Sequence, residues 1–146
     1  VLMPNQKEYF EELKLLAKDC SNIHFEDAVE VDKIPDYINQ FDIGLYILDN
    51  NSFNHEYALP NKFFEFVQAR LCLVMSPNTE MKNIIAQYDI GVVSEDFSAE
   101  KMAKKIQSLS ITEIRHYKEQ SHKFAYELSS EKTEQIILDE VNKLIK

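Results

Sequence analysis

Three short apolar runs divide the chain and limit the folds that it can adopt. They are "DIGLYIL" (42–48), "LCLVM" (71–75) and "IGVV" (90–93), and a segment of helical length follows each of them. A strand that is apolar almost throughout is typical of a parallel sheet that is covered on both faces. Strands that alternate with helices through short loops predict parallel pairing with crossover helices. We therefore predict an α/β, doubly wound fold.

The segments between these runs also show periodic patterns. Apolar residues at helical spacing predict a helix over 6–19, and "NIHF" (22–25) predicts a short strand. Asp32 has the side chain of an N-cap for a short helix that carries Tyr37. Further helices are predicted over 60–69, 79–87, 99–108, 111–127 and 131–145.

Composition limits the size of the protein and its partners. A length of 146 residues with 45% hydrophobic residues suits one domain with a sizeable core. The net charge of −9 argues against nucleic acid or an anionic membrane surface as a partner, because both need Lys and Arg. A small phosphorylated ligand is compatible with this charge, since local dipoles and one or two cations can dominate nearby.

The chain carries none of the sequence features of export or membrane insertion. No apolar stretch approaches the roughly 18 residues of a membrane span, and the start lacks the pattern of a signal peptide. Cys20 and Cys72 are too few for a disulfide framework, which favours a reducing cytosol. Because the first residue is Val1, we expect the sequence to be a piece of a longer protein.

A candidate site follows from the predicted topology. Open parallel sheets bind ligands beyond the carboxyl ends of their strands, where the loops 49–59 and 76–79 are expected. Both loops lead into helix N-termini, which favour anions. Lys62 lies in the first turn that Pro60 is suited to open, and Glu65 shares its face three residues later. The alternative is a Lys–Glu pair on a solvated helix face, and these residues alone favour neither interpretation.

Other kinds of site find little support in the sequence. There is no Gly-rich phosphate loop and no nucleophile elbow, and no catalytic residue can be assigned. His55 and Glu56 lie in the candidate loop, where a polar loop tip is the commoner explanation. The four histidines show no metal-ligand spacing, so no metal site is predicted; they are His24, His55, His116 and His122.

The stretch "ALPNKFFEFVQARLCLVMSP" (58–77) carries a resemblance to a known family. With Pro60-Asn61-Lys62, then Glu65, then the apolar run 71–75, it resembles the C-terminal, donor-binding domain of group 1 glycosyltransferases of the GT-B fold. The flanking segments resemble the same domain in the same order; they are "FDIGLYILDN", "NTEMKNIIAQYDIGVVSEDFSAEKMAKKI" and "SSEKTEQIILDEVNKLIK". The resemblance covers nearly the whole chain.

The resemblance implies a particular domain organisation. Residues 1–146 would be a single donor-binding domain fragment, with 111–146 as its C-terminal helices. The fold would be a Rossmann-like, doubly wound sheet that lacks its first strand and helix, with Val1–Met3 as the tail of the second strand. An incomplete sheet has an unpaired edge, which would allow a homo-oligomer to form through it.

The resemblance also implies a function. The intact protein would be a retaining glycosyltransferase of bacterial surface polysaccharide synthesis that uses a nucleotide-sugar donor and no further cofactor. It would work in the cytoplasm, with any membrane association through regions outside this chain. Its partner would be the N-terminal acceptor domain of the same protein, without which the fragment is inactive. A non-catalytic α/β interaction module and a nucleotide-sugar epimerase of similar architecture remain open as alternatives.

The resemblance assigns roles to residues of the loop and the following helix. Glu65 matches the glutamate that accepts hydrogen bonds from the ribose hydroxyls. The phosphate end of the site would be formed by Leu59, Pro60, Asn61 and Lys62. Glu56 and Tyr57 stand where many relatives carry a first glutamate that touches the transferred sugar. The chain also departs from the family at Arg70, where the helix end usually carries glycine.

Overall fold

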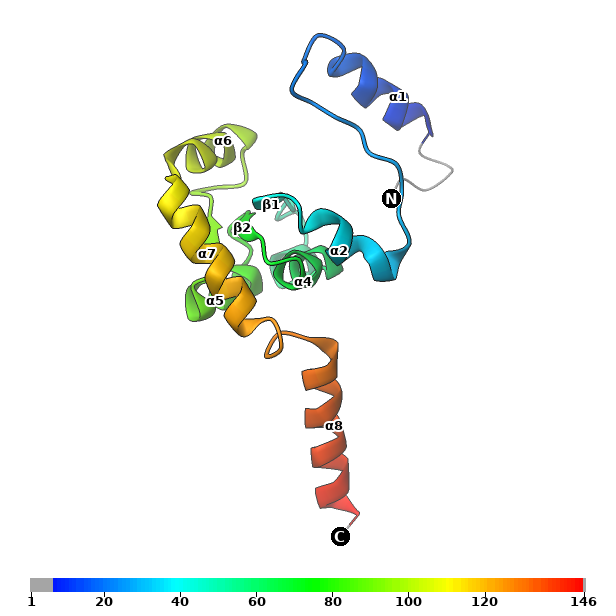
Figure 1. The fold of residues 1–146 in the computed structure, drawn as a ribbon, viewed down its shortest axis with the longest axis vertical. Coiled ribbons are helices and arrows are strands. Elements are labelled where there is room, and N and C mark those ends of the chain that lie inside the picture. Colours follow the sequence, from blue (N-terminus) through cyan, green and yellow to red (C-terminus); the bar gives the residue numbers. More distant parts are fainter. Residues whose placement is uncertain (1–6, 146) are drawn as a thin grey trace. The chain divides into compact units, whose positions relative to one another are not determined.

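The computed structural model describes residues 7–145, and Figure 1 labels elements of this part of the chain. The strand tail predicted at Val1–Met3 lies outside the described residues. Contacts divide the chain into two compact units, Val1–Ile34 and Pro35–Lys146, which are described separately. The assignment of 1–146 to one donor-binding domain stays a prediction.

The elements alternate between helices and short strands in the second unit. Their order is α1 (Lys7–Leu16), η2 (Val31–Lys33), α2 (Ile34–Ile38), β1 (Ile43–Tyr46), α3 (Phe53–Glu56), α4 (Asn61–Gln68), β2 (Cys72–Met75), α5 (Thr79–Tyr88), β3 (Gly91–Val93), α6 (Ala99–Ser108), α7 (Ile111–Phe124) and α8 (Ser130–Leu144). The predicted α/β class is confirmed. The helix α3 was not predicted, and Pro60 precedes α4 as its N-cap instead of opening its first turn.

The first unit corrects two predictions. Residues 22–25 do not form a strand, and residues 7–34, the described part of this unit, contain no strand that could satisfy their backbone groups. Instead, the ring of Phe25 packs edge-on against the ring of Phe10 in α1, with 5.5 Å between centroids. Asp32 is not an N-cap: it lies inside η2, whose N-cap is Glu30.

The second unit contains a three-stranded parallel sheet in the order β1-β2-β3. Ile43 is opposite Cys72 in the β1–β2 pair, and Leu73 is opposite Gly91 in the β2–β3 pair. The prediction that the three apolar runs are parallel neighbours is confirmed. All four side chains of the central strand β2 are fully buried, whereas Leu45 on the edge strand β1 is 47% exposed.

Helices pack against both faces of this sheet. Successive strand residues point to opposite sides, so β2 contributes to two separate clusters. Leu73 and Met75 lie in the cluster that α4 and α5 complete with Phe63, Val67, Met81 and Ile85. Cys72 and Val74 lie in the cluster that α6 and α7 complete with Met102, Ile106, Leu109, Ile114 and Tyr117. The central strand is therefore shielded by helices that precede and follow it in the sequence.

Both glycines of the chain lie where a side chain has no room. A Cβ at Gly91 would overlap the backbone carbonyl of Leu73 on the neighbouring strand. A Cβ at Gly44 would overlap the side chain of Phe66 in α4. At Gly91 the obstacle is the backbone of the sheet, which cannot move away easily. At Gly44 it is a side chain, which can move.

Arg70 ends α4 in the left-handed conformation that usually requires glycine, with φ of 60°. The N–H of Leu71 donates to the carbonyl of Phe66 at 3.0 Å, and the N–H of Arg70 donates to that of Val67 at 2.9 Å. This pair of bonds is the Schellman motif. The guanidinium of Arg70 also donates to the carbonyl of Gln68 at 2.7 Å, so the side chain caps the helix that its backbone terminates.

Polar contacts of α7 lie at the amino ends of the strands. Ser121 donates to the carbonyl of Leu71, just before β2, at 2.8 Å. Lys118 pairs with Asp42, just before β1, at 2.9 Å. His116 contacts the carboxylate of Asp89, two residues before β3, at 2.6 Å. Helix α7 therefore makes its polar contacts at the amino-terminal ends of the strands. The loops lie at the carboxyl-terminal ends.

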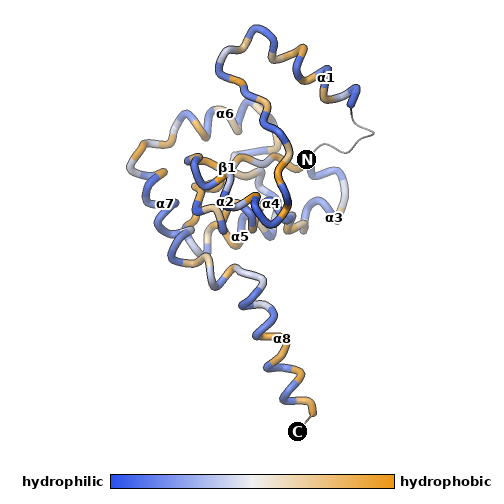
Figure 2. Tube along the Cα trace, turned by 45° about the vertical axis from the view of Figure 1, so that its right-hand side comes forward, coloured by the Kyte–Doolittle hydropathy of each residue, from blue (hydrophilic) through white to orange (hydrophobic). Residues whose placement is uncertain are grey.

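The last helix, α8, has no buried residue. Figure 2 shows apolar and polar residues alternating along it. Ile136, Ile137 and Leu138 each expose half or more of their surface. Among the described residues, no helix combines the length and the apolarity needed to cross a bilayer.

We predict that Gly91→Ala destabilises the protein more than Gly44→Ala. The first substitution must push β2 and β3 apart, and overpacking of a core costs about 1–3 kcal/mol or more. The second can be accommodated by movement of Phe66. Urea unfolding of the two variants measures the difference, with the exposed Gln107→Ala as a control. An equal loss in both glycine variants would contradict this interpretation.

We predict that Arg70→Ala is less stable than Arg70→Gly. Both variants lose the capping guanidinium, but only alanine retains the left-handed strain, which costs about 1–2 kcal/mol. The free energies of unfolding should differ by about this amount. Equal stabilities would mean that the backbone at residue 70 changes conformation when its side chain is removed.

Candidate functional site

The carboxyl edge of the sheet is the place where this fold can present a ligand site. The three strands are parallel, so β1, β2 and β3 end at the same edge. The segments that leave them are 47–60, 76–78 and 94–98. Ligands of open α/β sheets bind at this edge.

Two buried side chains join the first two of these segments. Ser76 and Asn78 are both fully buried. The hydroxyl of Ser76 donates to the side-chain oxygen of Asn78 at 2.6 Å and accepts from the N–H of Leu48 at 2.9 Å. The side-chain amide of Asn78 donates to the carbonyls of Leu48 at 3.2 Å and His55 at 2.8 Å. We call these two residues the Ser76–Asn78 clamp.

The clamp holds a loop that has its own internal order. Ser52 caps α3 by accepting from the N–H of His55 at 3.2 Å. The ring Nδ1 of His55 lies 3.1 Å from the carbonyl oxygen of Asp49. Because a carbonyl can only accept, Nδ1 carries the proton, and in the neutral ring Nε2 has the free lone pair.

The helix α4 begins without a side-chain cap. Pro60 is its N-cap residue and offers no acceptor. By contrast, a serine hydroxyl accepts from a first-turn N–H in α3, α6, α7 and α8. The N–H of Phe63 donates to the carbonyl of Pro60 at 2.9 Å, whereas those of Asn61 and Lys62 have no partner within residues 7–145. These two groups and the positive end of the helix dipole favour an anion.

Lys62 and Glu65 do not behave as an ion pair on a solvated face. No ion pair joins them in the described part of the chain; the ammonium of Lys62 lies over the ring of Tyr46, 5.5 Å from its centroid. Lys62 is exposed and Glu65 is half-buried. Within residues 7–145 the carboxylate of Glu65 has no polar partner, yet no buried side-chain oxygen is left unsatisfied, so it keeps access to water.

The other predicted site residues lie on the loop and at the start of α4. Glu56 is half-buried at the end of α3, and Asn61 is exposed. Tyr57 and Leu59 are 42% and 39% exposed. The ring of Tyr57 stacks on that of Phe53, with 4.7 Å between centroids. The loop thus presents an exposed aromatic pair beside the uncapped helix. That Lys62 and Glu65 face one open cleft stays a prediction.

Sequence reasoning missed the clamp and Phe53. The loop 76–79 was singled out for its position, but its side chains were not. The available signal was a serine and an asparagine directly after a wholly apolar strand, because polar residues beside a core are expected to be hydrogen-bonded.

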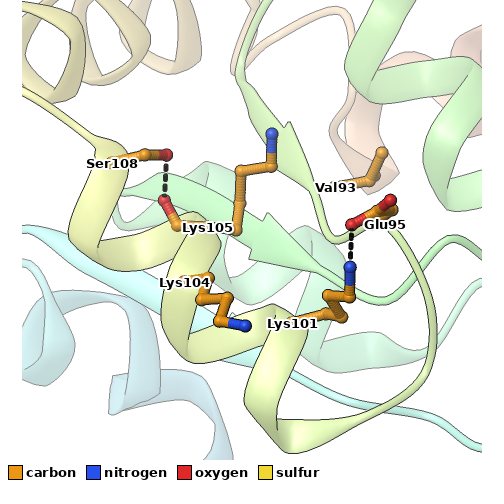
Figure 3. Close-up of a pocket in the computed structure, with 6 residues that line it drawn as sticks. All are labelled: Val93, Glu95, Lys101, Lys104, Lys105 and Ser108. Atoms are coloured by element: carbon orange, nitrogen blue, oxygen red, sulfur yellow. Dashed lines mark hydrogen bonds and ion pairs between the residues drawn. The ribbon is translucent and has the colours of Figure 1, made fainter.

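A second candidate lies at the end of β3. A hollow of about 360 Å³ is lined by Val93, Glu95, Lys101, Lys104, Lys105 and Ser108. Figure 3 shows the amino group of Lys101 turned to Glu95 and that of Lys105 pointing away from both. Lys104 pairs with Glu100 at 2.7 Å. Because two amino groups are neutralised and the third points elsewhere, this hollow is the weaker candidate.

The two thiols differ in their chemistry. Cys20 is exposed. Burial is the main cause that raises the pKa of the Cys72 thiol to about 12. A nucleophilic cysteine needs the opposite shift, so Cys72 is a core residue.

Comparisons with known proteins assign the chain to no family. The chain matches no family model, no curated protein and no solved structure.

We predict that Cys20 alone reacts with a thiol reagent at pH 8 in the native protein, and that Cys72 reacts only after unfolding. Because the folded pKa of Cys72 lies above its unfolded value of 9.0, its contribution to stability is complete below about pH 9. That contribution is lost as the pH rises toward about 12. Labelling of both thiols at equal rates in the native state would contradict the burial of Cys72.

Proposed function

We propose that this chain is the nucleotide-sugar donor-binding part of a retaining glycosyltransferase. The observation that carries the proposal is the carboxylate of Glu65. It is half-buried and has no polar partner among the described residues, one turn from the uncapped start of α4. A partly desolvated carboxylate with free acceptor capacity suits a ligand with hydroxyl donors.

The start of α4 supplies the complementary chemistry. The free N–H groups after Pro60 and the positive end of the helix dipole suit a diphosphate. Lys62 adds a cation at this end; its ammonium rests near Tyr46 and is engaged in no ion pair within the described residues. In glycosyl transfer the nucleoside diphosphate leaves as an anion, so groups that stabilise the bound diphosphate also stabilise the leaving group. Glu65 would accept hydrogen bonds from the ribose.

The loop before α4 supports a contact with the sugar. Tyr57 and Phe53 form an exposed stacked pair, and Glu56 is half-buried beside them. Sugar rings have apolar faces that can pack on aromatic rings, and carboxylates accept hydrogen bonds from hydroxyls. The phosphate end, which Leu59, Pro60, Asn61 and Lys62 would form, follows this loop directly.

The architecture and partners belong to the same proposal. The sheet is taken as part of a Rossmann-like, doubly wound domain of the GT-B type whose first strand and helix lie outside this chain. The N-terminal acceptor domain of the same protein would supply the other side of the site. The intact enzyme would act in the cytoplasm in bacterial surface polysaccharide synthesis. β1 is an edge strand of the sheet, with no second strand beside it among the described residues, and a second copy could pair there instead.

The exposed apolar residues of α8 favour a second candidate, a non-catalytic interaction module. Ile136, Ile137 and Leu144 would be its contact residues. Ligand binding separates the two proposals, because a nucleotide-sugar should stabilise a donor domain and leave a docking module unchanged. Turnover of a nucleotide-sugar without an acceptor would instead identify an epimerase.

We predict that Glu65→Ala weakens binding of the nucleotide-sugar by about 10- to 100-fold, because a hydrogen bond to a charged group contributes about 1.5–3 kcal/mol. Glu65→Gln keeps the shape and one acceptor oxygen, so its loss should be smaller. Calorimetric titration of the 146-residue chain with a panel of nucleoside diphosphate sugars measures both effects.

Glu119→Ala is the matched control, since Glu119 is an exposed glutamate on α7. It should bind like the unmodified chain. Unchanged affinity in a folded Glu65→Ala variant would refute the role of Glu65. The absence of binding by every nucleotide-sugar of the panel would refute the proposed function.

A further inference from the structure

We propose that Ser76 and Asn78 are positioning residues, which hold the loop 49–57 in one conformation before any ligand arrives. The expected effect of these two residues on the affinity for the donor rests on the proposed function. The structural part, the ordering of the loop, can be tested separately.

The burial of the clamp indicates why it acts as a unit. Ser76 and Asn78 are fully buried, and their bonds reach Leu48 at the start of the loop and His55 inside it. Each residue uses its side chain both to accept and to donate. Removal of either side chain would leave a buried polar group of the other one, and half-buried backbone groups of the loop, without a partner, which is costly.

The side chain of Asn78 bonds the loop and does not cap the helix that Asn78 begins. Asn78 is the N-cap residue of α5, and asparagine is among the best N-caps. Its side chain nevertheless makes no capping bond. Its oxygen accepts from Ser76 and its amide donates to Leu48 and His55, so helix capping is given up for contacts across the carboxyl edge.

The clamp fixes the residues that would meet the sugar. The carbonyl of His55 accepts from Asn78, its N–H donates to Ser52, and its Nδ1 contacts Asp49. With three of its polar groups engaged, the orientation of His55 is set, and the N–H of the adjacent Glu56 is held by the carbonyl of Ser52 at 3.1 Å. A preordered site binds more tightly because less ordering has to accompany binding.

Hydrogen exchange with and without the clamp tests the inference. The hydrogen-bonded amides of 49–57 are those of His55, Glu56 and Tyr57. In Asn78→Ala these amides should exchange at least about tenfold faster than in the unmodified chain, because local opening of the loop breaks the bonds that protect them. The amides of β2 should keep their rates. Asn83→Ala is the control, an exposed asparagine on the same helix, and should change neither group. Equal rates at 49–57 in the Asn78 and Asn83 variants would overturn the proposal.

A second pair of variants covers the case in which Asn78→Ala unfolds. Ser76→Thr and Ser76→Val add the same volume, but only threonine keeps a hydroxyl. Faster exchange at 49–57 in the valine variant than in the threonine variant is expected; equal rates would again overturn the proposal.

Donor affinity, measured with the same panel, should fall about tenfold with the clamp removed. If the unmodified chain binds no nucleotide-sugar, the proposed function fails, while the exchange rates still decide the role of the clamp.

Discussion

The second unit depends on the complete burial of one short strand. The four side chains of β2 have no exposed surface, and two of them belong to each core cluster. A strand with four residues can be buried in this way only if helices cover both faces and both neighbours pair closely with it. The lack of a side chain at Gly91 is what lets β3 approach Leu73.

The amino-terminal and carboxyl-terminal ends of the strands make different kinds of contact. At the amino edge α7 is bonded to the residues before each strand, through Lys118, Ser121 and His116. At the carboxyl end the Ser76–Asn78 clamp bonds the loop, while α4 begins without a side-chain cap and the carboxylate of Glu65 has no polar partner among the described residues. Bonds that stabilise the fold and groups available to a ligand are thus separated along the strands.

Much of the second unit could be predicted from the sequence because its patterns are local. The apolar runs and the 3.6-residue period specify strands and helices within a few residues. Residues 22–25 have the composition of a strand, but a strand also needs a neighbour, which no local pattern reports. The spacing of Lys62 and Glu65 predicts a shared face and cannot say whether they pair. The bonds of Asn78 reach residues 23 and 30 positions away, so no spacing rule could reveal them.

The separation of the two core clusters along the sequence has a consequence for synthesis on the ribosome. The helices α4 and α5 and the strand β1 surround only one face and one edge of β2. Cys72 and Val74 are covered by α6 and α7, and α7 ends only at Phe124. A nascent chain that has emerged only as far as β3 exposes these two apolar side chains. Partly made domains with exposed apolar surface are prone to aggregation. The unit can bury both faces of β2 only after residues 99–124 have been synthesised.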